Sequence, residues 1–351
     1  MSEVTAASSL ERRKQLAIEA VAAACAVTRT VQRELASIQG VSKDDKSPVT
    51  VADFAAQAVV NHVLSQSTQS GGPGLLMVGE ESAAILRDPS NRALLDQVVQ
   101  AVRLTWPNAA PSDVLHAIDL GGHDATASAY WTLDPVDGTK GFLRNGQYAL
   151  ALAWIEGGVV KVGVMGCPNL SLDFRRDFND PDPHGVIFAA VKGGGATMMS
   201  ASQPEGGAAA IRASGAKGAS GNQGPIRVCE SVESGHTRHD DTARIVERLG
   251  GAGTPARLDS QAKYGVVARG QADAYLRLPT KPGYVEKIWD HAAGSLVATE
   301  AGAVVTDIDG KPLDFSRGAG LSANRGVVCA GPGFHGRIIE AIAALGLHPQ
   351  R

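Results

Sequence analysis

The sequence predicts an α/β protein built from layers of sheet and helix. From residue 226 to residue 330, short apolar runs alternate with longer segments of helical periodicity, as in α/β folds. Earlier in the chain, two neighbouring apolar runs are joined by Glu156-Gly157-Gly158, which is typical of a β-hairpin turn. A chain of 351 residues, at roughly 100–200 residues per domain, favours two domains or one domain with two lobes.

The first part of the chain predicts helices around one short strand. Apolar residues recur every three or four positions from Val21 to Ile38, and a second periodic segment begins near Thr50. Residues 75–78 form an apolar run that predicts a buried strand, and residues 88–108 predict another helix. Residues 106–126 are less regular and predict a surface insertion.

The rest of the chain supplies the strands. We expect strands at residues 130–133, 148–155, 159–165, 185–191, 226–229, 274–278 and 327–330, and helices at 242–249 and 289–300. Residues 193–224 are rich in Gly, Ala and Ser, which predicts a mobile connection and not a fold element.

Composition excludes several classes of protein. A net charge of −3 argues against a nucleic-acid partner, because such binding needs an extended basic surface. No apolar run is long enough to span a membrane, and the N-terminus lacks the order of a secretory signal, so the cytoplasm is the expected location. The four cysteines form no CxxC pair and predict buried free thiols: Cys25, Cys167, Cys229 and Cys329.

Acidic residues stand at the ends of several expected elements. These are Asp53, Glu80 in Gly-Glu-Glu-Ser, Asp134 and Asp137 in Asp-Pro-Val-Asp-Gly-Thr, and Asp290 in Trp-Asp-His-Ala-Ala-Gly. Mg²⁺ prefers carboxylate oxygens, retained waters and substrate phosphate oxygens. Because carboxylates gathered in one place repel each other, a divalent cation is their natural partner.

Each of these residues also has a purely structural interpretation. Asp53 can complete a capping box begun by Thr50, and Asp290 can cap a helix. Glu80 can belong to a solvated turn, and Asp137 with Gly138 can be only a turn.

Taken together, these segments resemble the lithium-sensitive, magnesium-dependent phosphomonoesterase family of inositol monophosphatase and fructose-1,6-bisphosphatase. The order and spacing match from about residue 17 to residue 331. The resemblance implies a layered α/β/α/β/α sandwich, with residues 1–184 as an N-terminal α+β lobe and residues 185–351 as a C-terminal α/β lobe. It implies Mg²⁺ held by Glu80, Asp134, Asp137, Asp290 and the backbone carbonyl of Val136. Asp53 and Thr139 would orient and deprotonate the attacking water.

Segments in the second half resemble the bisphosphate nucleotidase branch of that family. They are the runs 230–236, 258–264, 275–279 and 286–291. The resemblance implies a small nucleotide bisphosphate as substrate, contacted by His236, Ser260, Lys263, Arg277, Thr139 and Asp290. Taken singly, His236 can be a surface loop histidine, Lys263 a solvated helix charge, and Arg277 a charge that protects a strand edge.

The expected reaction is hydrolysis of adenosine 3',5'-bisphosphate to AMP and phosphate, and of 3'-phosphoadenylyl sulfate to adenylyl sulfate. The resemblance adds inhibition by Li⁺ and a role in sulfate assimilation. One alternative is an inositol polyphosphate 1-phosphatase, and another is a nucleotide sensor without catalysis. The acidic residues together with Thr139 argue against the sensor, which needs no water-activating pair. The sequence predicts no oligomeric state.

Overall fold

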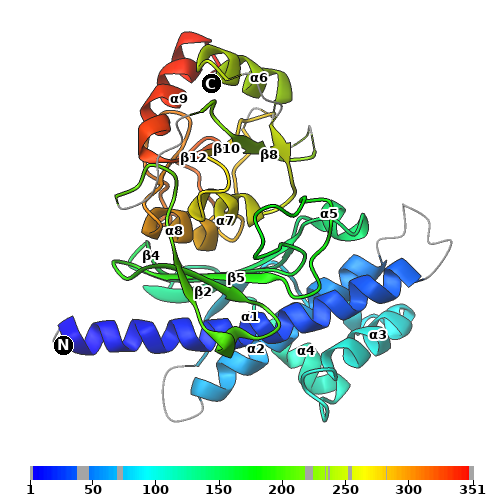
Figure 1. Cartoon of the computed structure of the whole chain (residues 1–351). Helices are drawn as coiled ribbons and strands as arrows, with labels where there is room; N and C mark the ends of the chain where they lie inside the picture. Colours follow the sequence, from blue (N-terminus) through cyan, green and yellow to red (C-terminus); the bar gives the residue numbers. More distant parts are fainter. Residues whose placement is uncertain are drawn as a thin grey trace.

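The computed structural model describes residues 3–37, 47–68, 74–217, 224–233, 235, 238–251, 255–281 and 283–347. They form five layers, in which helices and sheets alternate (Figure 1). This arrangement confirms the expected α/β/α/β/α sandwich.

The outer layer at the bottom of Figure 1 consists of two long and two short helices among the described residues. The two long ones pack against each other and against the first sheet, and the two short ones pack on the second long helix. They are α1 (Glu3–Ser37), α2 (Ser47–Thr68), α3 (Arg92–Val102) and α4 (Pro111–Asp119). Two 3₁₀ turns precede α3, at Ile85–Arg87 and Pro89–Asn91.

The first sheet has seven strands among the described residues, and they lie in chain order. The first two strands are parallel and every later pair is antiparallel. The strands are β1 (Met77–Gly79), β2 (Ala129–Asp137), β3 (Ala149–Glu156), β4 (Val159–Cys167), β5 (Val186–Val191), β6 (Gly195–Ser200) and β7 (Ala209–Ile211).

The second sheet has five strands among the described residues, in the order β11-β12-β10-β8-β9. They are β8 (Val228–Glu230), β9 (Ala256–Arg257), β10 (Ala274–Arg277), β11 (Val304–Thr306) and β12 (Val327–Ala330). Helices α7 (Ala262–Ala268) and α8 (Ala292–Glu300) lie between the two sheets, and α6 (His239–Arg248) and α9 (Pro332–Ala344) form the far outer layer (Figure 1).

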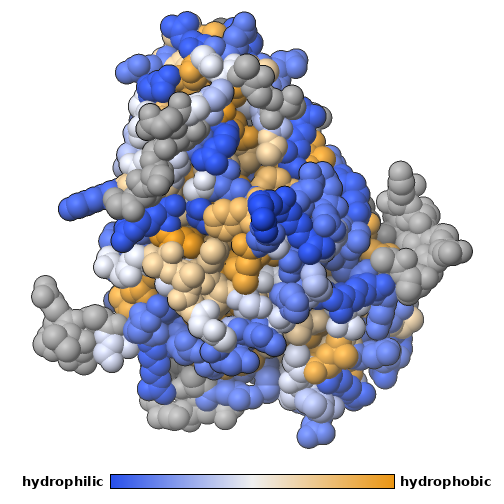
Figure 2. All heavy atoms as spheres, in the orientation of Figure 1, coloured by the Kyte–Doolittle hydropathy of each residue, from blue (hydrophilic) through white to orange (hydrophobic). Residues whose placement is uncertain are grey.

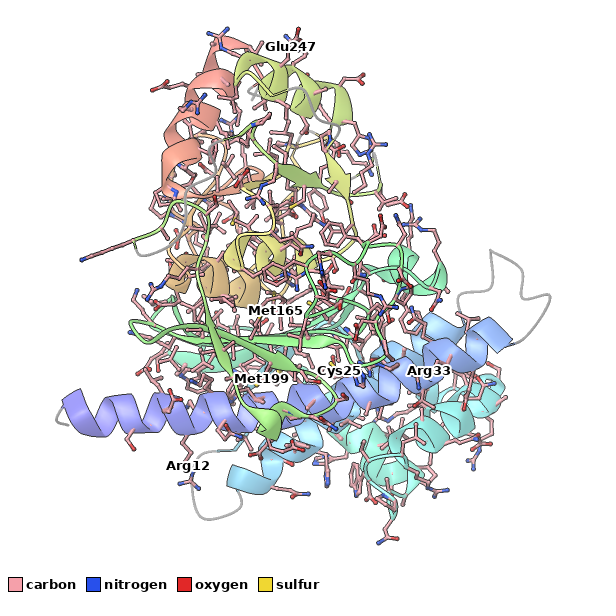
Figure 3. All side chains as sticks on the ribbon, in the orientation of Figure 1. Arg12, Cys25, Arg33, Met165, Met199 and Glu247 are labelled. Carbon is pink, nitrogen blue, oxygen red and sulfur yellow. The ribbon has the colours of Figure 1, made fainter. Side chains whose placement is uncertain are left out.

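Apolar side chains fill the space on both faces of the first sheet. Cys25 belongs to the core between α1, α2 and this sheet, whereas Met165 belongs to the core on the side of α7 and α8 (Figure 3). Helix α8 approaches β4 closely, because a Cβ atom on Gly163 would lie 2.8 Å from the carbonyl oxygen of Ala293. The position of Asp290, just before α8, is therefore fixed relative to the first sheet.

Two expectations about local structure are wrong. Residues 106–126 contain the regular helix α4, which buries Val114 and Ile118 and begins with Pro111, a residue favoured at the first helical position. Residues 193–224 contain β6 and β7, because the chain turns at Gly193 so that β6 pairs antiparallel with β5, and β7 then pairs antiparallel with β6. High Gly and Ala content hid these strands, whose stability comes from tertiary pairing.

The expected division at residues 184 and 185 remains a prediction about domains. Strands β5, β6 and β7 follow residue 184 and still belong to the first sheet, so the change of sheet falls between Ile211 and Val228.

The four cysteines are buried and free, as expected. Burial raises the pKa of the Cys25 and Cys229 thiols to about 12. Among the described residues, no helix combines the length and the apolar character needed to cross a membrane. On the face shown in Figure 2, hydrophilic residues cover most of the surface, and apolar residues are most visible near the middle of the view.

Candidate active site

The predicted acidic residues come from four segments that meet beside the first sheet. Because β1 and β2 are parallel neighbours, their carboxyl ends lie at the same edge. Glu80 follows β1 directly, opposite Asp134 in the β2 register, and Asp137 ends β2. Asp53 lies inside α2, and Asp290 lies two residues before α8.

A β-bulge places Asp134 and Asp137 on the same face of β2. Asp134 pairs with Ala151 and Asp137 pairs with Ala149, so Pro135 and Val136 stand opposite a single residue of β3. On a regular strand, the side chains of residues i and i+3 point to opposite faces of the sheet. The extra residue of the bulge shifts this alternation by one position, so that Asp134 and Asp137 point to the same face. Both carboxylates therefore face the layer that contains α7 and α8, while Val136 packs in the core on the other side.

Neighbouring carboxylates in the cluster raise the pKa of both Asp134 and Glu80. Asp134 is 3% exposed, and burial followed by the charges of Glu80, Asp137, Asp290 and Asp53 raises its pKa well above the ordinary value. Although Glu80 is exposed at the surface, desolvation by the surrounding protein, and then the neighbouring charges of Glu81 and Asp137, raise its pKa to about 7. Such a site favours the neutral forms of its acids unless a cation compensates the charge.

The donor set fits a divalent cation with oxygen ligands. The Oδ1 atom of Asp134 is buried and has no hydrogen-bond partner among the described residues, which is costly unless another group satisfies it. Glu80, Asp137 and Asp290 surround it, and all of them offer the hard oxygen atoms that Mg²⁺ prefers.

Asp290 also belongs to a second group, in which Glu286 and His291 are engaged by other side chains of the protein. Among the described residues, Glu286, Asp290 and His291 are the one set that brings three possible ligand atoms within 4.8 Å of one another. Both ring nitrogens of His291 are engaged, by the hydroxyl of Tyr264 and by Glu286. Since Arg277 also pairs with Glu286, this group is held by hydrogen bonds and charge pairing within the protein.

Thr139 begins the short helix α5 (Thr139–Leu143) directly after the bulged strand. The chain turns into this helix through Gly138, whose φ of 88° favours glycine. A Cβ atom on Gly138 would lie 3.0 Å from the Cβ atom of Ser260. Thr139 itself is exposed to solvent, two residues after Asp137 in the chain.

The side chain of Lys263 is buried, so the alternative interpretation of this residue as a solvated helix charge is wrong. Its Nζ atom donates to the carbonyl oxygens of Leu258 at 3.0 Å and of Ser260 at 2.7 Å. Burial lowers the pKa of Lys263 to about 8. These bonds hold the turn at Ser260, where φ is +72°.

Arg277 ends β10, an interior strand between β8 and β12, so the strand-edge interpretation is wrong. Its guanidinium pairs with Glu286 through two hydrogen bonds of 2.8 and 2.7 Å. The capping interpretations are also wrong: α2 begins at Ser47, well before Asp53, and the N-cap of α8 is His291. His236 lies outside the described residues.

Comparison with known proteins decides the family. The family model described as "Inositol monophosphatase family" matches residues 9–346. The chain belongs to the inositol monophosphatase family. A protein from Schizosaccharomyces pombe named 3'(2'),5'-bisphosphate nucleotidase is 40% identical over 96% of this chain and 96% of its own length. A protein of the same name from Emericella nidulans is 42% identical over 95% of this chain and 98% of its own length.

Solved structures of the inositol monophosphatase family share the fold. Mycobacterium tuberculosis SuhB aligns with a TM-score of 0.56 at 21% identity, covering 96% of this chain and 98% of its own. CysQ from Bacteroides thetaiotaomicron aligns with a TM-score of 0.57 at 18% identity, covering 91% of this chain and 97% of its own. At these identities the likeness concerns the fold alone.

Two buried glutamines of this family member were not predicted. The Gln57 amide donates to the carbonyl oxygen of Glu81 at 2.7 Å and accepts from the Glu81 N–H at 3.1 Å, which fixes the loop containing Glu80. Gln261 donates to the carbonyl oxygen of Trp289 at 2.8 Å and accepts from the N–H of Gly294. Glutamine in a helix or turn is usually exposed, so the residue type alone does not predict a buried role. For Gln261, the one signal in the sequence is its position inside the run 258–264, which resembles the bisphosphate nucleotidase branch.

Proposed function

We propose that this chain is a metal-dependent 3'(2'),5'-bisphosphate nucleotidase that hydrolyses adenosine 3',5'-bisphosphate to AMP and phosphate. The observation that carries the proposal is the set of carboxylates around the unpartnered Oδ1 atom of Asp134. The names of relatives at about 40% identity over nearly the whole chain support the substrate class.

The inositol monophosphatase family is generally metal-dependent, and we propose Mg²⁺ for this member. Glu80, Asp134, Asp137, Asp290 and the Val136 carbonyl would hold it. When bound, the metal neutralises phosphate charge and lowers the pKa of water.

The remaining work falls to side chains of the protein. Thr139 would orient the attacking water, and the Asp53 carboxylate would accept its proton. Burial raises the pKa of Asp53 well above its ordinary value, with further contributions from Glu81 and Glu80, which makes it a stronger proton acceptor once ionised. Ser260, Lys263, Arg277 and His236 would bind the rest of the nucleotide.

Activity on 3'-phosphoadenylyl sulfate, inhibition by Li⁺, a role in sulfate assimilation and a cytoplasmic location belong to the same proposal. An inositol polyphosphate 1-phosphatase is the less favoured alternative, because the two curated relatives described above are named for nucleotides. A sensor without catalysis is opposed by the intact set of carboxylates beside Thr139.

The test is a phosphate-release panel on metal-stripped protein. The substrates are adenosine 3',5'-bisphosphate, 3'-phosphoadenylyl sulfate, 3'-AMP and inositol 1,4-bisphosphate, each with chelator, Mg²⁺, Ca²⁺, or Mg²⁺ plus Li⁺. We expect turnover with Mg²⁺, the highest kcat/KM on adenosine 3',5'-bisphosphate, and inhibition by Ca²⁺ and Li⁺. Full turnover in chelator would refute the metal dependence, and preference for the inositol phosphate would refute the substrate.

A further inference from the structure

The guanidinium of Arg277 is held side-on by one carboxylate. Its Nε atom lies 2.8 Å from Oε1 of Glu286, and its Nη2 atom lies 2.7 Å from Oε2. Both side chains are largely removed from solvent, with exposed fractions of 18% and 10%. A bidentate charged pair of this kind fixes the plane of the guanidinium.

Glu286 is itself held in place. His291 lies 3.4 Å from its Oε2 atom through Nε2, and the other ring nitrogen lies 2.9 Å from the hydroxyl of Tyr264. Although burial disfavours the charged form, His291 and Arg277 lower the pKa of Glu286 to about 2. The carboxylate therefore stays ionised, and a buried chain runs from Tyr264 to Arg277.

Arg277 and Glu286 also line a cavity of about 510 Å³. Gly235, which directly precedes the predicted contact His236, lines it too, as do Leu278, Pro279 and Tyr284. The charge of Arg277 also acts on Asp290, a predicted metal ligand. Arg277 therefore both lines a space large enough for part of a nucleotide and lies close enough to the acidic cluster to interact with it.

The side-on pairing leaves part of the guanidinium free of Glu286. Arginine carries five N–H donors, and Glu286 takes one from Nε and one from Nη2. Tyr275 and Tyr284 also hydrogen-bond with the guanidinium. The fork formed by Nη1 and the second N–H of Nη2 has the arrangement that matches two oxygen atoms of a phosphate.

We propose that Glu286 is a positioning residue for substrate specificity, which orients Arg277 so that this fork binds the phosphate that is not hydrolysed. The inference rests on the proposed nucleotidase function. It predicts that loss of the Glu286 charge weakens binding of the 5'-phosphate and leaves the chemical step unchanged. If Glu286 instead competed with substrate for Arg277, the same change would strengthen binding.

The experiment compares wild type with Glu286→Gln on adenosine 3',5'-bisphosphate and on 3'-AMP, which lacks the 5'-phosphate. For the bisphosphate we expect KM to rise about 10- to 100-fold, the effect of losing a hydrogen bond to a charged group, with kcat within about twofold. The kinetic constants for 3'-AMP should not change. Calorimetry without turnover should show weaker binding of AMP and unchanged binding of adenosine.

Two further variants keep the test decisive. Asp273→Asn breaks a similar side-on pair, with Arg227 at 3.0 and 2.7 Å, and should leave both KM values unchanged. Tyr264→Phe removes only the hydroxyl that holds His291 and should raise the bisphosphate KM by about 2- to 10-fold, the range for a neutral hydrogen bond. If Glu286→Gln does not fold, the bisphosphate KM of Tyr264→Phe decides whether the inference stands.

An unchanged or lowered bisphosphate KM in Glu286→Gln would overturn the inference while wild-type preference for the bisphosphate stands. A wild type that prefers inositol 1,4-bisphosphate would instead overturn the proposed function, and the inference with it.

Discussion

The backbone N–H of Gln261 donates a hydrogen bond of 2.5 Å to the Oδ2 atom of Asp137, although 124 residues separate them in the chain. This bond ties the turn before α7 to the end of β2. The Gln261 side chain continues the connection to Trp289 and Gly294, on either side of Asp290. One residue therefore sets the spacing between carboxylates from both halves of the chain.

The first prediction concerns this connection. Gln261→Ala leaves the Trp289 carbonyl and the Gly294 N–H buried without a partner, so the free energy of unfolding should fall by about 2–4 kcal/mol. The Mg²⁺ concentration for half-maximal activity should also rise, because Asp290 loses its support. Urea unfolding and a metal titration measure the two effects.

The control is Gln66→Ala, which removes an exposed amide from α2 and should change the free energy of unfolding by less than about 0.5 kcal/mol. Equal effects of the two substitutions would contradict the assigned role.

The second prediction separates the chemical step from metal binding. Thr139→Ala should lower kcat with little change in KM, because only the group that orients water is lost. Asp134→Asn should lower kcat by orders of magnitude, and calorimetry should show weaker metal binding. A raised KM with unchanged kcat in Thr139→Ala would show that Thr139 acts in binding instead.

The third prediction concerns acid stability. Hydrogen bonds from Lys140 and Arg144, at 2.8 and 2.6 Å, lower the pKa of Glu233 from 4.5 to about 2. Because the folded pKa is the lower one, Glu233 stabilises the fold above its unfolded pKa, and this contribution disappears as pH falls toward 2. The difference in unfolding free energy between wild type and Glu233→Gln should therefore be constant near neutral pH and shrink below about pH 5.

The matched control for this experiment is Glu247→Gln on the outer surface of α6, seen at the top of Figure 3. Its difference from wild type should stay small across the same range of pH. A Glu233 difference that grows on acidification would have the wrong sign for this mechanism.

The fourth prediction explains the glycine of the Trp-Asp-His-Ala-Ala-Gly segment. A Cβ atom on Gly294 would overlap the ring of Tyr264, so Gly294→Ala should destabilise the protein by about 1–3 kcal/mol, as overpacking does. In α9, a Cβ atom added to Gly336 would meet no described atom within 4 Å apart from its chain neighbours and the backbone of its own helix. Gly336→Ala should therefore stabilise by about 0.5–1 kcal/mol through helix propensity. Thermal unfolding of both variants measures the contrast, and a neutral Gly294→Ala would contradict the close packing.

Local sequence was sufficient to predict most helices and strands, and to select the carboxylates that lie close together in the structure. Asp134 and Asp137 stand in one short motif, and helical or strand periodicity is a property of neighbouring residues. The same reasoning failed for β6 and β7, whose composition is typical of linkers. Strand β6 forms because β5 offers a partner edge, and β7 forms on the edge of β6; periodicity within one segment does not reveal such partners.

What the sequence by itself determined is therefore the chemistry: which acids are present, in which motifs, and which layered fold contains them. Only the tertiary structure decided how those groups are held. The bulge that turns Asp137 to the face of Asp134, the burial of Lys263 and the side-on pairing of Arg277 with Glu286 all depend on contacts between distant segments. Such contacts form when packed layers bring buried donors and acceptors together, and each buried polar group must then find its partner there.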